Sequence, residues 1–517
     1  MHPAFQNLEV IHTVSSYTQH GSLPAFASTC RAFESPALNV LWRYLQSVEP
    51  LVKCLPSDLF GIDHGCVVLQ KPLEGKMWDT LSKYTSRVHS ITQSGHLKGI
   101  EHLSLLMLSC PLASASLFPN LHEITWRADG TQCAAEFLRM AFVPTLLVLD
   151  LQILSASSAF LSVLSSLGTL CPRLQDIVVK VPHPTDHLFR KSSPFITLPI
   201  SQLHHLRTLR VWDLGNRGIE HVMQLRALQS LWLDLRASST WDARPHLQFP
   251  GFDDLHLLGF FARTFECVSN FLSSLQVVRS KGISICLSHK ASANGSTVMM
   301  LSQLFTILRE RCENDKLESF VLFVNSTKVF KQVRTEPGIF TPLHAYSNLT
   351  RLDIEKCCDM SMSDEELCQL VGTWPKLRVL KISCHVAIND TTVPTFHGLI
   401  SLLRLCPALT SLALVIDTTK LEGIDLKCPG GERCNEQLKS LALGNSSIES
   451  PVNVALILSG LFPCLTQVNL DCWDTAPMNS LPQKKSDMER WELTNSILGG
   501  FSLVRQRGIK ACRCSDL

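Results

Sequence analysis

A short leucine-rich pattern recurs along most of this 517-residue chain. The pattern is Leu-x-x-Leu-x-Leu, with Ile, Val, Phe or Trp also accepted at the apolar positions, and it fits thirteen times from residue 100 onward. Apart from one longer interval, successive copies lie 21 to 32 residues apart. A template that returns at such a period predicts a repeat architecture. Its first positions are Ile100, Leu121, Leu146, Leu174, Leu206, Leu228, Phe252, Leu317, Leu349, Leu377, Leu409, Leu438 and Leu465.

The segments between the copies have the signals of helices. Ser363 is a good N-cap, and the acidic residues 364–366 that follow it suit the positive end of a helix dipole. Pro375 then ends the helix before the next copy of the template. Similar apolar helical faces are expected at Phe396, Leu399, Ile400 and Leu403, and again at Val454, Ile457, Leu458 and Leu461.

Strand, loop, helix and proline in this order predict an α/β fold of the leucine-rich-repeat type, a curved solenoid of irregular repeats. No single unit of this kind can bury its apolar face alone, so the repeats must stack. The alternative is an ordinary α/β protein with leucine-rich strands, which would not need the same template at every strand. The interval between Phe252 and Leu317 is expected to hold an irregular repeat around residues 283–285.

Three short apolar helices are predicted within residues 7–55. Ser22 can cap the second helix, and Ser35 can cap the third, with Pro36 at its first position. The apolar faces recur at helical spacing. They consist of Leu8, Ile11 and Val14, then Leu23, Phe26, Ala27 and Cys30, then Leu38, Leu41, Trp42 and Leu45.

These residues carry a resemblance to a known family. Residues 8–11 with Val14 and Tyr17, then 29–33, then 36–38 and 41–43, resemble an F-box, in the form found in fungal (basidiomycete-type) F-box/leucine-rich-repeat proteins. Leu8 stands where that family usually has proline. The segment that leads into the repeats is also similar to the family, at Trp78, Tyr84, Arg87 and Val88.

The resemblance implies a substrate-recognition adaptor of an SCF-type, cullin-RING E3 ubiquitin ligase. The box would dock on a Skp-family linker and the repeats would bind a protein substrate, whose identity the sequence does not give. By the same resemblance, the docking residues are Leu8, Glu9, Ile11, Leu23, Cys30, Phe33, Leu41 and Trp42.

Other interpretations remain open at this point. One is that Phe33, Leu41 and Trp42 pack inward on Trp78 and Tyr84 rather than on a partner. A second is a leucine-rich-repeat scaffold for protein interactions that does not engage a ligase. A third, from another class, is an enzyme with a thiol nucleophile or a metal.

The sequence suggests four successive parts. Residues 1–55 form the box, residues 56–96 a bridging helical linker, and residues 97–473 the repeat solenoid. Residues 474–517 contain a polar loop and then a terminal helix, with Met488, Trp491, Asn495 and Leu498 at helical spacing. Such a helix would cover the open end of the stack.

In repeats of this type, the x positions of each strand lie on the concave face. We expect substrate contacts there, and their mixed charges argue against a polyanionic ligand. The formal net charge of +2 likewise gives no electrostatic case for nucleic acid or for an anionic membrane. The expected contacts are Arg210, Trp232, His256, Arg351, Asp353 and Lys381.

Motifs of catalysis or cofactor binding are missing from the sequence. There is no glycine-rich phosphate loop, no Gly-x-Ser-x-Gly and no His-Glu-x-x-His, so neither an enzyme nor a cofactor is expected. Four thiols, at Cys428, Cys434, Cys512 and Cys514, could bind zinc, but neither spacing is a Cys-x-x-Cys knuckle. No metal site is predicted.

The twenty cysteines bear on the compartment. The chain opens without the basic and apolar pattern of a signal sequence, so the cysteines are expected to be buried thiols in a reducing cytosol or nucleus. Residues 151–171 carry no charge, but their apolar residues follow an amphipathic period. We therefore expect a buried helix there rather than a membrane span.

Overall fold

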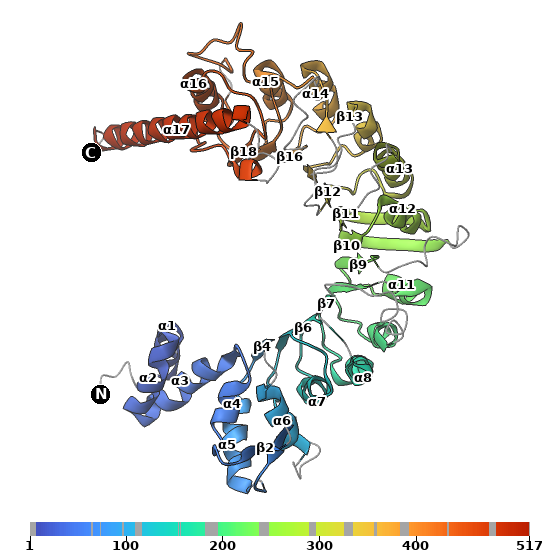
Figure 1. The fold of residues 1–517 in the computed structure, drawn as a ribbon, viewed down its shortest axis with the longest axis vertical. Coiled ribbons are helices and arrows are strands. Elements are labelled where there is room, and N and C mark those ends of the chain that lie inside the picture. The colour runs from blue at the N-terminus through green and yellow to red at the C-terminus, as the bar shows by residue number, and fades with distance from the viewer. Residues whose placement is uncertain are drawn as a thin grey trace. The chain divides into compact units, whose positions relative to one another are not determined.

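The protein is described from a computed structural model of the chain. Within the described part, the chain separates into two compact units, residues 1–237 and 238–517. Each unit is described by itself, and Figure 1 labels many of the elements of both. The structure describes residues 7–515, with gaps at 64–65, 73, 96–97, 109–115, 154, 156, 181–194, 213, 237–247, 289–295, 325–333, 356–358, 383–391, 432–433 and 475–481.

The sheet of unit 1 is parallel, in the order β1-β4-β5-β6-β7-β8-β9. Its register sets Ile124, Leu149, Ile177, Leu209 and Leu231 side by side in one buried row. Alternate residues of each strand therefore reach the same face. The strands are β1 (Tyr44–Leu45), β4 (Ser90–Ser94), β5 (Glu123–Arg127), β6 (Val148–Gln152), β7 (Asp176–Lys180), β8 (Thr208–Trp212) and β9 (Ser230–Asp234).

The helices that follow these strands cover one face of the sheet, where Trp126 of β5 stacks on Phe137 at 5.8 Å between ring centroids. In Figure 1 the opposite face of β5–β9 has no helix over it among the described residues, and we call it the open face. An antiparallel hairpin, β2 (Phe60–Asp63) with β3 (Cys66–Leu69), stands apart from the sheet. The helices after the N-terminal three are α4 (Glu49–Lys53), α5 (Gly75–Thr85), α6 (Lys98–Leu108), α7 (Gln132–Ala141), α8 (Ser158–Leu164), α9 (Leu167–Leu170) and α11 (Gly215–Met223).

Unit 2 has a parallel sheet of its own, in the order β10-β11-β12-β14-β16-β17-β18. Phe320, Leu352, Leu380, Leu412 and Leu441 form its buried row. A short separate pair joins β13 (Arg334–Thr335) to β15 (Asp359–Met360). The strands of the sheet are β10 (Phe249–Ala262), β11 (Leu275–Leu287), β12 (Ser319–Val324), β14 (Arg351–Glu355), β16 (Val379–Lys381), β17 (Ser411–Ala413) and β18 (Ser440–Ala442).

Helices again cover one face of the sheet in unit 2 and leave an open face opposite (Figure 1). The predicted helix after Ser363 is confirmed with a full capping box. Ser363 Oγ accepts from the Glu366 N–H at 3.2 Å, and the Glu366 carboxylate accepts from the Ser363 N–H at 2.7 Å. The helical elements are α12 (Phe265–Ser273), α13 (Ser296–Arg311), η3 (Pro337–Ala345), α14 (Asp364–Val371), α15 (Phe396–Leu405), α16 (Pro451–Leu461), η4 (Asp471–Asp474) and α17 (Pro482–Ser515).

The predicted α/β fold class and most of the strand template are confirmed. Within the described residues, the template coincides with β5 to β9 and with β12, β14, β16, β17 and β18. The irregular repeat expected near residue 283 is also present, because β11 pairs with both β10 and β12 and buries Ile283 and Ile285. At Phe252 the template fits only in part. β10 has a bulge after Phe252, where Asp254 has a φ of 60°, and burial continues at Leu258 instead of Leu257.

The strand predictions at the two ends of the template are wrong. Ile100 lies in helix α6, and Ile100 and Leu103 are buried there because a spacing of three residues suits a helix as well as the template. The first strand of the parallel sheet that is paired along its whole length is β4, which begins ten residues earlier in the chain. At Leu465 no strand forms, and only a single bridge joins Asn469 to Ala442 of β18.

The N-terminal helices are α1 (Leu8–Tyr17), α2 (Leu23–Thr29) and α3 (Arg31–Arg43), together called the N-terminal box, with the short turn η2 (His20–Ser22) before α2. The predicted start of the third helix is wrong. Cys30 is extended, with φ −161° and ψ 160°, so it ends α2 and occupies the N-cap position of α3 without a side-chain cap, and Pro36 lies inside α3. Ser22 does precede α2, but its side chain caps no backbone N–H.

The uncharged segment at 151–171 forms two short helices rather than one. They are α8 and α9, and Phe160, Leu164 and Leu167 are buried. None of the helices in the described ranges has the length and apolar character needed to cross a bilayer. The division into four parts by sequence stays a prediction.

Candidate partner-binding surfaces

The N-terminal box has a small core of its own. α1 begins after Asn7, whose Oδ1 accepts from the Glu9 N–H at 2.9 Å, and the helix buries only Ile11 and Ser15. Phe26 of α2 stacks on Phe33 of α3, with ring centroids 4.7 Å apart. The other residues of α1 are at least partly exposed, and several of the exposed ones are apolar.

The structure divides the eight predicted docking residues between surface and core. Ile11, Leu23 and Trp42 are buried, so their side chains are not accessible to a partner and instead support the exposed docking residues by packing. Trp42 packs on Tyr84 of α5 at 4.6 Å between ring centroids, which is the inward packing considered as an alternative. The five residues with accessible surface are Leu8, Glu9, Cys30, Phe33 and Leu41.

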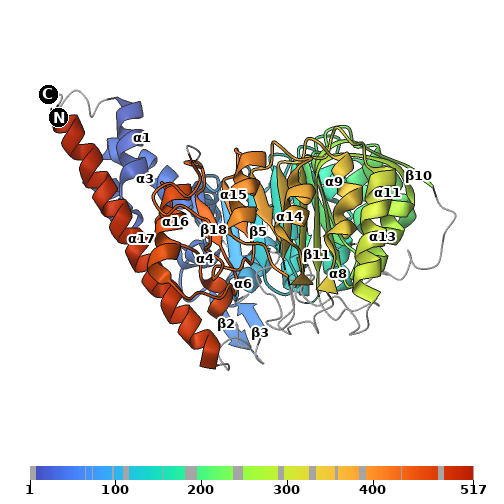
Figure 2. The ribbon, with the colours of Figure 1, turned by 90° about the horizontal axis from the view of Figure 1, so that it is seen from above.

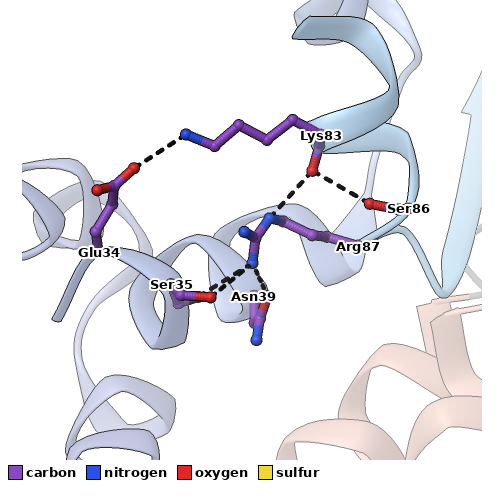
Figure 3. Close-up of polar contacts among 6 residues, drawn as sticks. All are labelled: Glu34, Ser35, Asn39, Lys83, Ser86 and Arg87. Carbon is purple, nitrogen blue, oxygen red and sulfur yellow. Dashed lines mark hydrogen bonds and ion pairs between the residues drawn. The ribbon is translucent and has the colours of Figure 1, made fainter. Parts of the chain in front are cut away.

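The box is held to the sheet by α5 and the turn after it, through the contacts drawn in Figure 3. The Arg87 guanidinium donates to the Ser35 carbonyl at 3.2 Å and to the Asn39 side-chain oxygen, both on α3. Beside it, Lys83 pairs with Glu34 at 3.0 Å, and its hydrogen bond and charge lower the pKa of that carboxyl. These contacts fix the orientation of α3 relative to α5.

The backbone provides a second attachment, because α3 runs directly into β1. Tyr44 and Leu45 pair in parallel with Ser90 and Ile91 of β4, and the His89 N–H donates to the Arg43 carbonyl at 2.9 Å. Leu45 is buried in the unit core. The last helix of the box is therefore joined directly to a strand of the unit 1 sheet, with no linker residues between them.

On the open face of unit 1, the structure brings Arg210 and Trp232 together. They are register partners on β8 and β9, and the guanidinium carbon lies 5.4 Å from the indole centroid, a cation–π contact. The same row continues to Asp150 of β6, whose carboxylate is 3.8 Å from the ammonium of Lys180. Trp232 is half buried, and the Arg210 guanidinium lies over its ring.

Three more predicted residues form one cluster on the open face of unit 2. The Asp353 carboxylate is 4% exposed, and it pairs with Arg351 at 2.5 Å and with Lys381 at 3.4 Å. Asp353 and Lys381 are register partners on β14 and β16. The cluster carries two cations on one anion, so it presents a local positive charge. His256 is exposed on the bulged strand β10 and belongs to no such cluster.

Sequence reasoning missed a second feature of this face. Phe261, Cys286 and Phe323 lie side by side on β10, β11 and β12, and all three are half buried. Phe323 lies one residue beyond the six-residue template that begins at Leu317, whereas Phe261 lies four residues beyond the copy at Phe252 and Cys286 belongs to the irregular repeat. An aromatic residue directly after the template was the available signal for Phe323 alone.

The described cysteines are not paired with one another, and several are core residues. Burial raises the pKa of Cys171, Cys312 and Cys406 to about 12, so these thiols stay protonated. The described residues hold no group of three or more His, Cys, Asp or Glu side chains that could bind a metal ion. Cys428 and Cys434 are exposed, whereas the side chains of Cys512 and Cys514 lie outside the described part.

Comparisons with known proteins give little more. No protein-family model matches the chain, and no curated protein matches it either. Among solved structures, the chain is similar to one described as "Crystal structure of TLR13-ssRNA13 complex", at 15% identity and a TM-score of 0.32, over 74% of this chain and 55% of that one. The chain thus spans about half the length of that neighbour, and a likeness of this size carries no argument about function.

Proposed function

We propose that this chain is a substrate-recognition adaptor of an SCF-type, cullin-RING E3 ubiquitin ligase. The N-terminal box would dock on a Skp-family linker, and the open faces would bind a protein substrate. The chain would do no chemistry itself and would act by raising the local concentration of substrate near the ligase. The described cysteines form no disulfide with one another, which suits the cytosol or the nucleus.

The exposed apolar surface of α1 is the observation that supports this proposal most. Leu8 is 68% exposed, Tyr17 88% and Val14 37%, although the box has a core of its own. Val14 and Tyr17 are three residues apart, so they are neighbours on one side of the helix. Large apolar side chains left outside a small helical unit are typical of a docking site for another protein.

The test is binding of the full chain to a recombinant Skp-family linker by titration calorimetry. Leu8→Asp and Tyr17→Asp change exposed residues only, so the box should stay folded. We expect each to weaken binding at least about tenfold, the loss of one hot-spot contact. Ile62→Asp, at an 80% exposed apolar residue of the hairpin, is the matched control and should bind normally.

Truncation of residues 1–55 would be a poor version of this test. Val48 and Leu51 are fully buried and Leu45 nearly so, so the deletion would open the core of unit 1. Trp42→Ala has the same defect, since Trp42 packs on Tyr84. If the wild-type chain fails to bind the linker at roughly 100 µM, or both Asp variants bind as it does, the adaptor proposal is wrong.

A second candidate is a protein-interaction scaffold that does not engage a ligase. The half-buried Phe323 favours it together with the Arg351, Asp353 and Lys381 cluster, because Phe323 lies on β12, the strand next to β14, and aromatic and arginine residues are common at interface centres. This candidate predicts no linker binding, together with recovery of other proteins that Arg351→Glu abolishes. Affinity purification with mass spectrometry, on the wild type and both classes of variant, distinguishes the two.

A further inference from the structure

The C-terminal helix α17 has two faces of different character. One face packs on the last elements of unit 2, where Trp491, Thr494 and Leu498 are buried. There the Trp491 Nε1–H donates to the Ser446 carbonyl at 2.9 Å, and Arg505 donates to the Ser459 hydroxyl at 2.9 Å. Figures 1 and 2 show α17 running along α16 and continuing beyond it. This face accounts for the capping role expected from the sequence.

The opposite face of α17 is exposed and still apolar. Leu493 is 51% exposed, Leu503 56% and Val504 69%. These residues point away from the buried face because each lies about half a helical turn from it at 3.6 residues per turn. One line of residues along this face is called the outer stripe. It consists of Glu489, Leu493, Ser496, Gly500, Leu503 and Arg507, and Val504 lies next to it in sequence.

The outer stripe has the spacing of a coiled-coil seam and is symmetric in position. Successive members are 4, 3, 4, 3 and 4 residues apart. The two leucines lie five residues on either side of position 498. Ser496 and Gly500 lie two residues on either side of it. The acidic Glu489 and the basic Arg507 lie nine residues on either side of it.

We propose that the outer stripe binds a second copy of this chain, as an antiparallel pair of α17 helices around a two-fold axis at the level of residue 498. In that alignment each Leu493 meets the other copy's Leu503. Each Ser496 meets the other Gly500, and each Glu489 meets the other Arg507. A two-fold interface must be complementary to itself, and this stripe is.

The charges at the two ends of the outer stripe favour a second copy of this chain as the partner and an antiparallel orientation of the two helices. Glu489 and Arg507 are 18 residues apart, about 27 Å along one helix, so they cannot pair within a copy. Neither forms an ion pair with any described side chain, and both are exposed. A parallel pair would set Glu489 against Glu489 and Arg507 against Arg507, whereas the antiparallel pair matches opposite charges at both ends.

The centre of the stripe suits a close approach of two helices. A Cβ built on Gly500 meets nothing within 4 Å, so the single chain places no steric demand for glycine there. Glycine in an exposed helix interior is otherwise unfavourable. Between two helices, Ser496 and Gly500 would let the backbones come near while the leucines pack on both sides.

Sedimentation velocity of the full chain, from about 1 to 100 µM, measures the proposed dimer, since one short helical contact is expected to give a dissociation constant on the order of micromolar. We expect a monomer–dimer equilibrium that Leu493→Glu shifts at least about tenfold toward monomer. Val452→Glu alters an exposed apolar residue of α16 away from the stripe and serves as the control. It should leave the equilibrium unchanged.

A charge swap tests the charged contacts at both ends of the stripe. The single variants also test the direction, because a parallel wild-type pair would already set like charges together. Glu489→Arg and Arg507→Glu should each weaken self-association, because both ends of the pair then carry like charges. Mixing the two variants should restore it, because one copy then carries a cation at both stripe ends and the other copy an anion at both. A wild-type chain that sediments as a monomer at 100 µM overturns the proposal, as does a mixture that associates no better than either variant alone.

Discussion

The Arg87 guanidinium donates to the side-chain oxygen of Asn39, across 48 positions of sequence. The same group donates to the Ser35 carbonyl at 3.2 Å, and its Nε donates to the Lys83 carbonyl at 3.1 Å. One side chain therefore ties the middle of α3 to the end of α5 (Figure 3). The orientation of the proposed docking surface depends on this contact.

Arg87→Ala should loosen α3 without unfolding the sheet. Hydrogen bonds from a charged donor contribute about 1.5–3 kcal/mol each where they are sheltered from water and less near the surface, so we expect a loss of about 1–2 kcal/mol for the attachment of the box. Hydrogen exchange of the amides in residues 31–43 should rise, while that of β5 and β6 should not. Arg226→Ala, at an exposed arginine of the same unit, provides the comparison, and equal exchange in both variants would contradict the prediction.

Asn495 closes the end of unit 2 in the way a further strand would. Its side chain accepts from the Val468 N–H at 2.7 Å and donates to the Val468 carbonyl at 2.9 Å. Asn495→Ala leaves both backbone groups without this partner and should cost about 1–3 kcal/mol. Gln506→Ala, at an exposed residue of the same helix outside the outer stripe, should change the free energy of unfolding by less than about 0.5 kcal/mol. Chemical denaturation of the two variants measures both, and equal losses would refute the role given to Asn495.

The strands could be predicted from sequence because their burial is repetitive. Leu149, Leu209, Leu352 and Leu412 each stand at the same place in a template, and stacking buries all of them in rows. Ile100 could not be assigned in this way, because its spacing to Leu103 fits a helix and the template equally. The strand predicted at Leu465 does not form, because the side-chain amide of Asn495 bonds the Val468 backbone in place of a neighbouring strand.

The contacts that define the surfaces could not be predicted because they are tertiary. The sequence places Arg210 and Trp232 on one face, but only the register between β8 and β9 sets one over the other. Arg351 and Lys381 belong to different repeats, and both reach the carboxylate of Asp353. The start of α3 depended on the extended backbone of Cys30, which outweighed the local signal of Ser35 and Pro36.

Asp353 should matter more for stability than its place on an open face suggests. It is 4% exposed, and it is the shared partner of Arg351 and Lys381. Asp353→Ala leaves two cations close together without their anion, and we expect a loss of about 2–4 kcal/mol. Asp253→Ala removes a carboxylate whose side chain is 79% exposed and paired with Arg279, and should cost less than about 1 kcal/mol. Similar denaturation midpoints for the two variants would show that the buried carboxylate is not a shared anchor.

The junction between box and sheet should be sensitive to acid through His89. Burial, with smaller contributions from Arg43 and His122, lowers the pKa of His89 in the folded chain. The unfolded chain therefore takes up a proton first as the pH falls, and the stability that neutral His89 contributes is present above its unfolded pKa of about 6.5 and lost below it. The His89 ring stacks on His122 at 5.1 Å between centroids, so a charge there also meets a second imidazole.

Thermal unfolding at pH 7.5 and pH 5.5 measures this dependence. The wild-type midpoint should fall on acidification, and His89→Gln, which keeps a polar side chain but cannot be charged, should reduce that fall. His12→Gln alters an exposed histidine of α1 and is the matched control, with an unchanged pH dependence. If His89→Gln follows the wild type at both pH values, the acid sensitivity lies elsewhere and the junction does not respond to protonation at this site.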